Sequence, residues 1–115
     1  MPRNMSFMLT KDQVYNRQKD VTRRMGWAFL KAGDILNAVE KGMGLKKGEK
    51  VVRICQIRVI SSRWEPLIDI TDNSHEVVRE GFPHMTSMDF VEMFIQSHKD
   101  CDYNTPVNRI EFEYL

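Results

Sequence analysis

Residues 51–60 limit the possible folds more than any other segment of the chain. Their sequence, VVRICQIRVI, is rich in β-branched side chains, which favour an extended backbone. Odd and even positions both carry valine or isoleucine, so both faces of a strand here would be apolar. Other parts of the protein must therefore pack on both faces of such a strand. The segment therefore predicts a central strand, or one stave of a barrel-like sheet.

Shorter patterns before this segment predict strands and one helix. Residues 5–9 are expected to form a short buried strand, and residues 35–40 a second strand. A short helix is expected to begin at Lys11, with Thr10 as its cap. Residues 20–25 fit either a strand or a continuation of that helix.

The second half of the chain predicts a loop, two helices and a final strand. Residues 41–50 hold three of the six glycines and four lysines, which favours a flexible, basic hairpin loop. One helix is expected at about residues 73–81. Another should follow Thr86, because an apolar stripe with helical spacing comes after it: Phe90, Val91, Phe94 and Ile95. Apolar and charged side chains then alternate over residues 109–114, as in a half-buried strand.

The order of these elements indicates the fold class. Helices and strands do not alternate one by one, which argues against a doubly wound parallel sheet. A chain of 115 residues is long enough for one domain with one core. We therefore predict a single α+β domain over residues 1–115, with a curved or barrel-like sheet and flanking helices.

The charge balance limits the partners of the protein. Lys and Arg number 17 and Asp and Glu number 16, which excludes a strongly basic nucleic-acid coat but not a local basic patch. No apolar stretch approaches the ~18 residues of a membrane span, and no signal-peptide core follows Arg3. Two cysteines in a domain with its own core need no disulfide. We expect a cytoplasmic protein without a membrane partner, and we take it to be a monomer.

The most unusual local composition is RQKDVTRR at residues 17–24. Four cations lie within eight residues, beside the hydroxyl group of Thr22 and close to Trp27. Guanidinium groups suit phosphate or carboxylate, and an aromatic ring can stack on a base. A solvated cationic face at a helix end has the same composition, so the pattern alone leaves both interpretations open.

Lys19 and Thr22 could act together as a base and a nucleophile. A lysine is a base only when it is neutral, which requires burial or neighbouring positive charge. Arg23 and Arg24 could supply that charge, whereas Asp20 would favour the ammonium form. The sequence does not decide between these effects.

Two further positions have a possible chemical role. Glu80 ends a predicted helix, where the helix dipole disfavours a carboxylate, although an exposed glutamate is the ordinary expectation there. His98 and Cys101 have the spacing of metal ligands, but no second pair accompanies them, so His98 is expected to pack at a helix end. We expect neither a metal nor a cofactor.

Taken together, these segments resemble the ASCH family, a branch of the PUA-like fold. The family signature is approximately Gly-x-Lys-Thr-x-Thr-x-Arg, and Lys19, Thr22 and Arg24 stand at its lysine, second threonine and arginine. The Gly-Asp that usually follows is present as Gly33-Asp34. Later segments resemble bacterial and phage members over nearly the whole chain: WEPLIDIT, REGFP, DFVEMFIQSHKDC and TPVNRIEF.

The chain departs from the signature at two positions. Arg17 replaces the glycine, so the turn there is made without the residue that best tolerates a positive φ. Asp20 replaces the first threonine and adds a negative charge.

The resemblance implies a small β-barrel with helices around it, and a cleft lined by the Lys-Thr-Arg segment. It also implies a link to RNA or modified nucleosides. One branch of the family hydrolyses the acetamide of N4-acetylcytidine, and its catalytic lysine, threonine and glutamate match Lys19, Thr22 and Glu80. A ribonuclease activity has been proposed for another branch.

Three functions follow as hypotheses. The first is a module that binds RNA or a modified nucleoside, in which Arg24, Lys19 and Arg23 hold a phosphate or a base edge and Trp27 stacks. The second is an amidohydrolase, in which Thr22 attacks the acetyl carbonyl and Lys19 takes its proton. The glutamate would protonate the leaving amine. The third is a ribonuclease, whose lysine and arginine would stabilise a pentavalent phosphorane.

Overall fold

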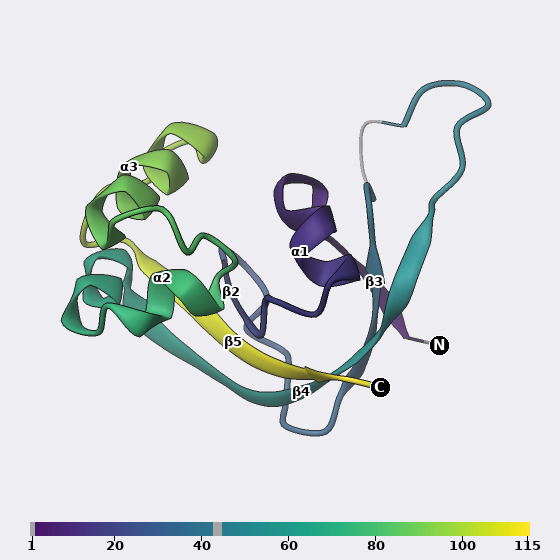
Figure 1. The fold of residues 1–115 in the computed structure, drawn as a ribbon, viewed down its shortest axis with the longest axis horizontal. Helices are drawn as coiled ribbons and strands as arrows, with labels where there is room; N and C mark the ends of the chain where they lie inside the picture. Colours follow the sequence, from purple (N-terminus) through teal and green to yellow (C-terminus); the bar gives the residue numbers. More distant parts are fainter. Residues whose placement is uncertain (1, 43–44) are drawn as a thin grey trace.

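The protein is described by a computed structural model of residues 2–42 and 45–115, in which one mixed five-stranded sheet is the main element. The strand order is β1-β3-β4-β5-β2. Strands β4 and β5 are long and bent, so the sheet curls into a half-barrel (Figure 1). Its strands are β1 (Arg3–Ser6), β2 (Val21–Arg24), β3 (Ile35–Val39), β4 (Arg53–Pro66) and β5 (Pro106–Tyr114).

Short helices cover the two ends of this half-barrel. Elements η2, α2 and α3 gather at one end of β4 and β5, while α1 lies near the other end (Figure 1). The helical elements are η1 (Met8–Thr10), α1 (Lys11–Tyr15), η2 (Leu67–Asp72), α2 (His75–Arg79) and α3 (Ser87–Ser97). The predicted α+β class with a barrel-like sheet and flanking helices is therefore confirmed.

The strand predicted at residues 51–60 is β4, which lies between β3 and β5. Ile57 and Val59 on its inner face are buried. The prediction of two covered faces is wrong at the outer face, because a half-barrel encloses only one side of its sheet, and Ile60 is exposed. The exposed Val51 and Val52 precede the strand, which instead continues to Pro66.

Several predicted boundaries also differ from those observed. The strand predicted at residues 5–9 ends at Ser6, since the chain turns into η1 and leaves Met8 and Leu9 exposed. Residues 20–25 form strand β2 because they pair with β5. The helix predicted at 73–81 is shortened to α2, because the 3-10 turn η2 occupies the residues before it.

The loop predicted at residues 41–50 includes residues 43 and 44, which lie outside the described residues. The described remainder of that segment contains no helix and no strand.

Helix α3 follows Thr86, as its sequence predicts, and begins with a reciprocal capping box. The Asp89 backbone N–H donates to Thr86 Oγ1 at 3.1 Å, and the Thr86 N–H donates to Asp89 Oδ2 at 3.3 Å. The predicted apolar stripe faces inward, with Phe90, Val91 and Phe94 buried.

The capping box gives the first testable prediction. Thr86→Ala should lower the free energy of unfolding by about 1 kcal/mol, because the Asp89 N–H in the first turn of the helix loses its acceptor, Thr86 Oγ1. This corresponds to a fall of about 4 °C in the melting temperature of a domain of this size. Thr71→Ala, in an exposed turn, is a suitable control for thermal unfolding by circular dichroism. Equal melting temperatures for the two variants would contradict the assignment.

The apolar residues form two separate clusters rather than one core. The first lies inside the half-barrel and includes Phe7, Ile57 and Phe112. The second lies under the helices η2, α2 and α3 and includes Leu67 and Phe90. The polar residues described next lie between these two clusters.

Candidate functional site

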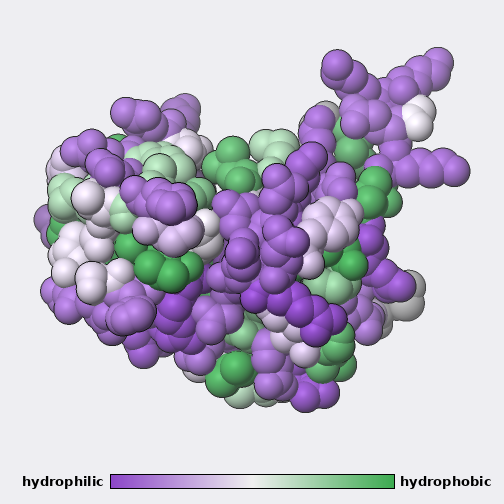
Figure 2. All heavy atoms as spheres, in the orientation of Figure 1, coloured by the Kyte–Doolittle hydropathy of each residue, from purple (hydrophilic) through white to green (hydrophobic). Residues whose placement is uncertain are grey.

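A cavity of about 230 Å³ lies where β2, η1 and α3 meet. One part of its lining is polar and comes from β2 and the residues around it: Lys19, Thr22, Arg23, Arg24 and Glu80. The remaining wall is largely apolar and comes from η1, α3 and the loop before α3: Phe7, Met8, Leu9, Phe82, Phe90, Met93 and Phe94. Figure 2 shows apolar residues interrupting the hydrophilic surface between the helical end of the molecule and α1.

Lys19 and Glu80 form a buried ion pair at this cavity. Lys19 Nζ lies 2.9 Å from Glu80 Oε1 and donates a second hydrogen bond to the Glu80 carbonyl oxygen at 2.6 Å. Their side chains are only 3% and 2% exposed. The ordinary expectation of an exposed glutamate at a helix end is therefore wrong, because the lysine and an arginine both bind this carboxylate.

The turn after α2 brings Glu80 into place. Gly81 has a φ of +101°, a conformation that side chains other than glycine rarely adopt. A Cβ atom there would lie 3.1 Å from Gln13 Cγ and 3.6 Å from Lys19 Cβ. Gln13 Nε2 also donates to the Gly81 carbonyl at 3.1 Å. This close approach holds the end of α2 against the residues that precede β2.

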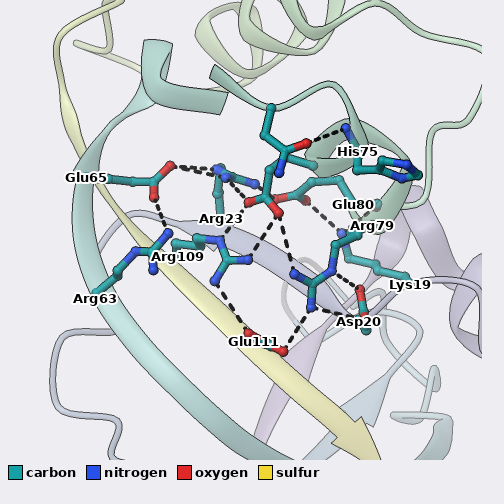
Figure 3. Close-up of polar contacts among 12 residues, drawn as sticks. Lys19, Asp20, Arg23, Arg63, Glu65, His75, Arg79, Glu80, Arg109 and Glu111 are labelled. Atoms are coloured by element: carbon teal, nitrogen blue, oxygen red, sulfur yellow. Dashed lines mark hydrogen bonds and ion pairs between the residues drawn. The ribbon is translucent and has the colours of Figure 1, made fainter. Parts of the chain in front are cut away.

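Arg23 extends the ion pair into a network of buried charges (Figure 3). Its guanidinium group donates to Glu80 Oε2 at 2.9 Å, to Glu76 Oε1 at 2.6 Å and to Glu65 Oε2 at 3.1 Å. Arg109 binds Glu76 from the other side, with Nε at 2.7 Å and Nη2 at 3.1 Å. Three carboxylates, Glu65 from β4 and Glu76 and Glu80 from α2 and its C-cap, thus fix the orientation of Arg23.

Burial and neighbouring charge shift the pKa values of the polar residues. Burial lowers the pKa of Lys19, assisted by the charges of Arg24 and Arg23 and opposed by the Glu80 carboxylate. Burial likewise lowers the pKa of Arg24 to about 10. For Glu76, burial raises the pKa, but the hydrogen bonds from Arg109 and Arg23 outweigh it and hold the pKa at about 2.

The low pKa of Glu76 predicts acid sensitivity. The carboxylate is stabilised in the folded state, so its contribution is complete above the ordinary glutamate pKa of 4.5 and is lost as the pH falls towards 2. We expect the free energy of unfolding to fall by about 2–3 kcal/mol over that range through this group. Urea unfolding of the wild type and of Glu76→Gln at pH 6, 4 and 3 measures it. The variant should show a smaller pH dependence, and parallel curves would contradict the prediction.

Thr22 and Arg24 also interact at the cavity. Arg24 Nε donates to Thr22 Oγ1 at 3.0 Å, and Arg24 Nη2 donates to the Ser6 carbonyl at 2.6 Å. The guanidinium carbon lies 4.8 Å from the centre of the Phe7 ring. Thr22 accepts the bond from Arg24, so its own hydroxyl proton is available for donation.

Five of the six residues predicted for the site line one cavity, and the sixth does not. Lys19, Thr22, Arg23, Arg24 and Glu80 are brought together. Trp27 instead packs against the half-barrel core and lies 5.5 Å from the ring of Phe29, so the tight turn after β2 takes it away from the described cavity lining.

Two other expectations around the lysine have clear outcomes. The sequence suggests that Asp20 favours the ammonium form of Lys19. In the structure the Asp20 carboxylate instead binds Arg79 at 3.0 Å. The side chain of His98 packs at the end of α3, as expected. Its ring stacks on Phe94 with 4.0 Å between centroids, and Nδ1 lies 2.9 Å from the Phe94 carbonyl oxygen.

Sequence reasoning missed Glu65 and Glu76, which bind Arg23, and Arg109, which binds Glu76 from the other side. Alternation in the last strand placed Arg109 on the solvent side, yet it is buried because α2 covers that face. Glu76 and Glu65 carry no local signal either, because each is an ordinary polar residue in a short amphipathic segment. These residues come together only when β2, β5 and α2 pack against one another, so their positions along the chain do not reveal the network.

The cavity has an excess of positive charge. Of its cationic lining residues, Lys19 and Arg23 are paired with carboxylates, whereas Arg24 bonds the Thr22 hydroxyl and the Ser6 carbonyl and has no carboxylate partner among the described residues. A buried positive site favours an anionic ligand, or a neutral ligand on which negative charge develops during a reaction.

Comparisons with known proteins place the fold. No family model and no curated protein matches the sequence. Among solved structures, the hypothetical protein PH0355 superposes with a TM-score of 0.69 at 15% identity, with both chains fully covered. Protein EF3133 from Enterococcus faecalis V583, of the family DUF984, has a TM-score of 0.66 at 12% identity and covers 100% of this chain and 76% of its own.

At these identities the similarity concerns the fold alone. Two proteins of different sequence share the curled sheet and short helices, so the half-barrel is a recurring architecture. Over the described residues, no helix has the length and apolar character needed to cross a membrane.

Proposed function

We propose that the protein is an ASCH-type amidohydrolase that removes the acyl group from an N4-acetylcytidine-like nucleoside. The observation that carries the proposal is the convergence of Lys19, Thr22 and Glu80 on one cavity, with a buried lysine–glutamate contact of 2.9 Å. Burying charged groups costs stability, and perturbed titratable residues in a cavity are typical of catalytic sites.

Two backbone features support the ASCH assignment. Arg17 has a φ of +57°, the left-handed conformation that glycine adopts most easily, and the family signature has glycine at this position. Gly33 has a φ of +95°, and its N–H donates to the Val59 carbonyl at 2.7 Å. Both turns therefore have the geometry that the glycines of the signature would favour.

The first chemical step is a proton shift within the ion pair. Transfer of one proton from Lys19 Nζ to Glu80 Oε1 along their hydrogen bond produces a neutral amine and a neutral carboxylic acid. Burial favours the neutral lysine, whereas the Glu80 carboxylate beside it favours the ammonium form. The pair then holds both the base and the acid that amide hydrolysis requires.

Attack on the substrate uses each of these groups once. Thr22 Oγ1 bonds to the acyl carbon while its proton passes to Lys19 Nζ, and the carbonyl oxygen becomes an oxyanion that Arg24 stabilises. When the C–N bond breaks, Glu80 donates its proton to the leaving nitrogen, giving cytidine and an acyl ester of Thr22. Water then bonds to the acyl carbon as the ester C–O bond breaks, Thr22 Oγ1 regains a proton, and acetate and one proton are released to the solvent. The lysine and glutamate finish in their original ionic forms.

The size of the cavity favours a single nucleoside over a polymer. Pockets for drug-sized ligands usually measure about 300–1,000 Å³, so a cavity of about 230 Å³ suits one small planar group. A ribonuclease must hold a longer polyanion, and the cavity lining offers fewer phosphate partners than such binding usually needs.

A binding module for a modified nucleoside is the second candidate. The positive excess at the cavity and the placement of Arg24 support recognition of an electron-rich group without any reaction. In that case the lysine–glutamate contact would only be structural.

Incubation of the purified protein with N4-acetylcytidine tests the proposal, with release of cytidine and acetate followed by chromatography. Lys19→Ala should remove the turnover, and Lys31→Ala, at an exposed lysine, should retain it. Turnover that persists in Lys19→Ala would show contamination or another mechanism. No turnover by the wild type, combined with measurable binding, would favour the binding module. Cleavage of RNA but not of 2′-deoxy oligonucleotides would favour the ribonuclease.

A further inference from the structure

Strand β2 is an edge strand whose backbone is paired on one side only. Its ladder partner is β5, and β1 lies at the opposite end of the sheet order. The Phe112 N–H donates to the Asp20 carbonyl at 3.0 Å, whereas the Asp20 N–H donates to the Arg79 carbonyl, so this first hydrogen-bonded pair of the ladder makes one of its two bonds. In an antiparallel ladder such pairs recur at every second residue. The next pairs along β2 are therefore Thr22 with Ile110 and Arg24 with Asn108.

This register determines where the backbone of Arg23 points. Residues between the hydrogen-bonded pairs direct their N–H and C=O groups away from the partner strand. The N–H and C=O of Arg23 therefore face the open edge of β2. The hydrogen bonds between β5 and β4 follow the matching alternation, because the Leu67 N–H donates to the Thr105 carbonyl at 3.0 Å on that side of β5.

The cavity runs along this open edge. Thr22, Arg23 and Arg24 are consecutive residues, and all three line it. Alternate side chains of a strand point to opposite faces, so three consecutive residues can share one cavity only if it borders the strand edge. Arg23 as a whole is only 4% exposed, so its edge-facing backbone groups lie in a poorly solvated place.

We infer that the backbone N–H and C=O of Arg23 bind the hydrogen-bonding edge of a cytosine-like base. One residue of an edge strand presents a donor and an acceptor side by side, which matches a planar ring with an adjacent acceptor and donor. Cytosine offers N3 as acceptor and the N4 amino group as donor, whereas uracil offers the reverse arrangement. The inference rests on the proposed function both in taking the cavity ligand to be a nucleoside and in taking its base to be cytosine.

The surroundings of Arg23 suit a small rigid ligand. Hydrogen bonds to Glu80, Glu76 and Glu65 hold its side chain, so the backbone is ordered before the ligand binds. The bond from Arg24 Nη2 to the Ser6 carbonyl at 2.6 Å links β2 to β1 and blocks addition of a further strand at this edge. A base fits beside such an edge more readily than an extended peptide.

Binding of cytidine, 3-deazacytidine and uridine to the wild-type protein tests the inference by calorimetry. In 3-deazacytidine a C–H group replaces the acceptor N3, and in uridine donor and acceptor are exchanged. We expect 3-deazacytidine to bind about tenfold more weakly than cytidine, and uridine at least as weakly, because the buried N–H is left without an acceptor. Equal affinities for cytidine and uridine, or no binding of cytidine, would overturn the inference.

Nuclear magnetic resonance adds a direct readout at the backbone. In ¹⁵N-labelled protein, cytidine should shift the Arg23 amide proton downfield, while the amide of Ile57 in the central strand stays in place. An unchanged Arg23 amide in the presence of bound cytidine would also overturn the inference. These measurements use a ligand without an acyl group, so they are independent of turnover. Hydrolysis without cytosine selectivity would refute the inference alone, and selectivity without hydrolysis would refute the proposed reaction alone.

Discussion

Thr22→Val should reduce hydrolysis of N4-acetylcytidine by at least about a thousandfold, because the substitution removes the attacking oxygen while keeping the volume of the side chain. Turnover would be measured by chromatography at saturating substrate. The affinity for cytidine should change little, since the hydroxyl acts on the acyl group and not on the base. A fall in kcat without a matching loss of cytidine binding is the expected result.

Thr22→Ser is the matched control for this experiment. Serine keeps an oxygen that can accept the 3.0 Å hydrogen bond from Arg24, so activity should stay within about tenfold of the wild type. Thermal unfolding of both variants checks that the fold is retained. If valine and serine gave equal activities, Thr22 would not be the nucleophile, and a water molecule activated by Lys19 would replace it in the mechanism.

Glu80→Gln should cause the largest loss of stability of any single change at the site. The carboxylate lies 2.9 Å from both Lys19 Nζ and Arg23 Nη1, and its removal leaves two buried cations with insufficient negative charge. Breaking a buried ion pair from one side costs about 3–5 kcal/mol. We expect a fall of roughly 10–20 °C in the melting temperature, measured by circular dichroism.

Two comparisons separate this effect from a general sensitivity to lost charges. Glu113→Gln breaks an exposed pair with Arg58 at 3.0 Å and should cost at most about 1 kcal/mol. The double variant Lys19→Met with Glu80→Gln should recover part of the loss, because it removes the lysine that has lost its carboxylate, whereas Arg23 keeps Glu76 and Glu65. A double variant less stable than Glu80→Gln alone would show that the lysine is not destabilised by the missing carboxylate.

Five of the six residues predicted for the site line one cavity, whereas several predicted element boundaries differ from those observed. Lys19, Thr22 and Arg24 lie close together along the chain, so one short strand is sufficient to place them beside one another. Glu80 could be associated with them only through the family resemblance, because 61 residues separate it from the lysine. Its burial depends on the turn at Gly81, whose positive φ no local pattern specifies.

The boundaries depend on packing between distant segments. Val51 and Val52 have strong strand preference, yet they are exposed before β4 because the half-barrel does not extend over them. Arg109 follows an alternating pattern that places it outward, but α2 covers that face and provides Glu76 as a partner. In each case the packing of distant segments, and not the local residue preference, determines whether the side chain is buried.

The pairing of β2 with β5 determines when the site can exist during synthesis of the chain. Val21 pairs with Glu111, so the strand that carries Thr22 has no ladder partner until the last of the five strands has left the ribosome. Contacts between such distant segments form slowly, because a long loop must close before they contribute. Incomplete chains therefore contain all three proposed catalytic residues without the geometry that joins them, and we expect the site to form only when translation has passed β5.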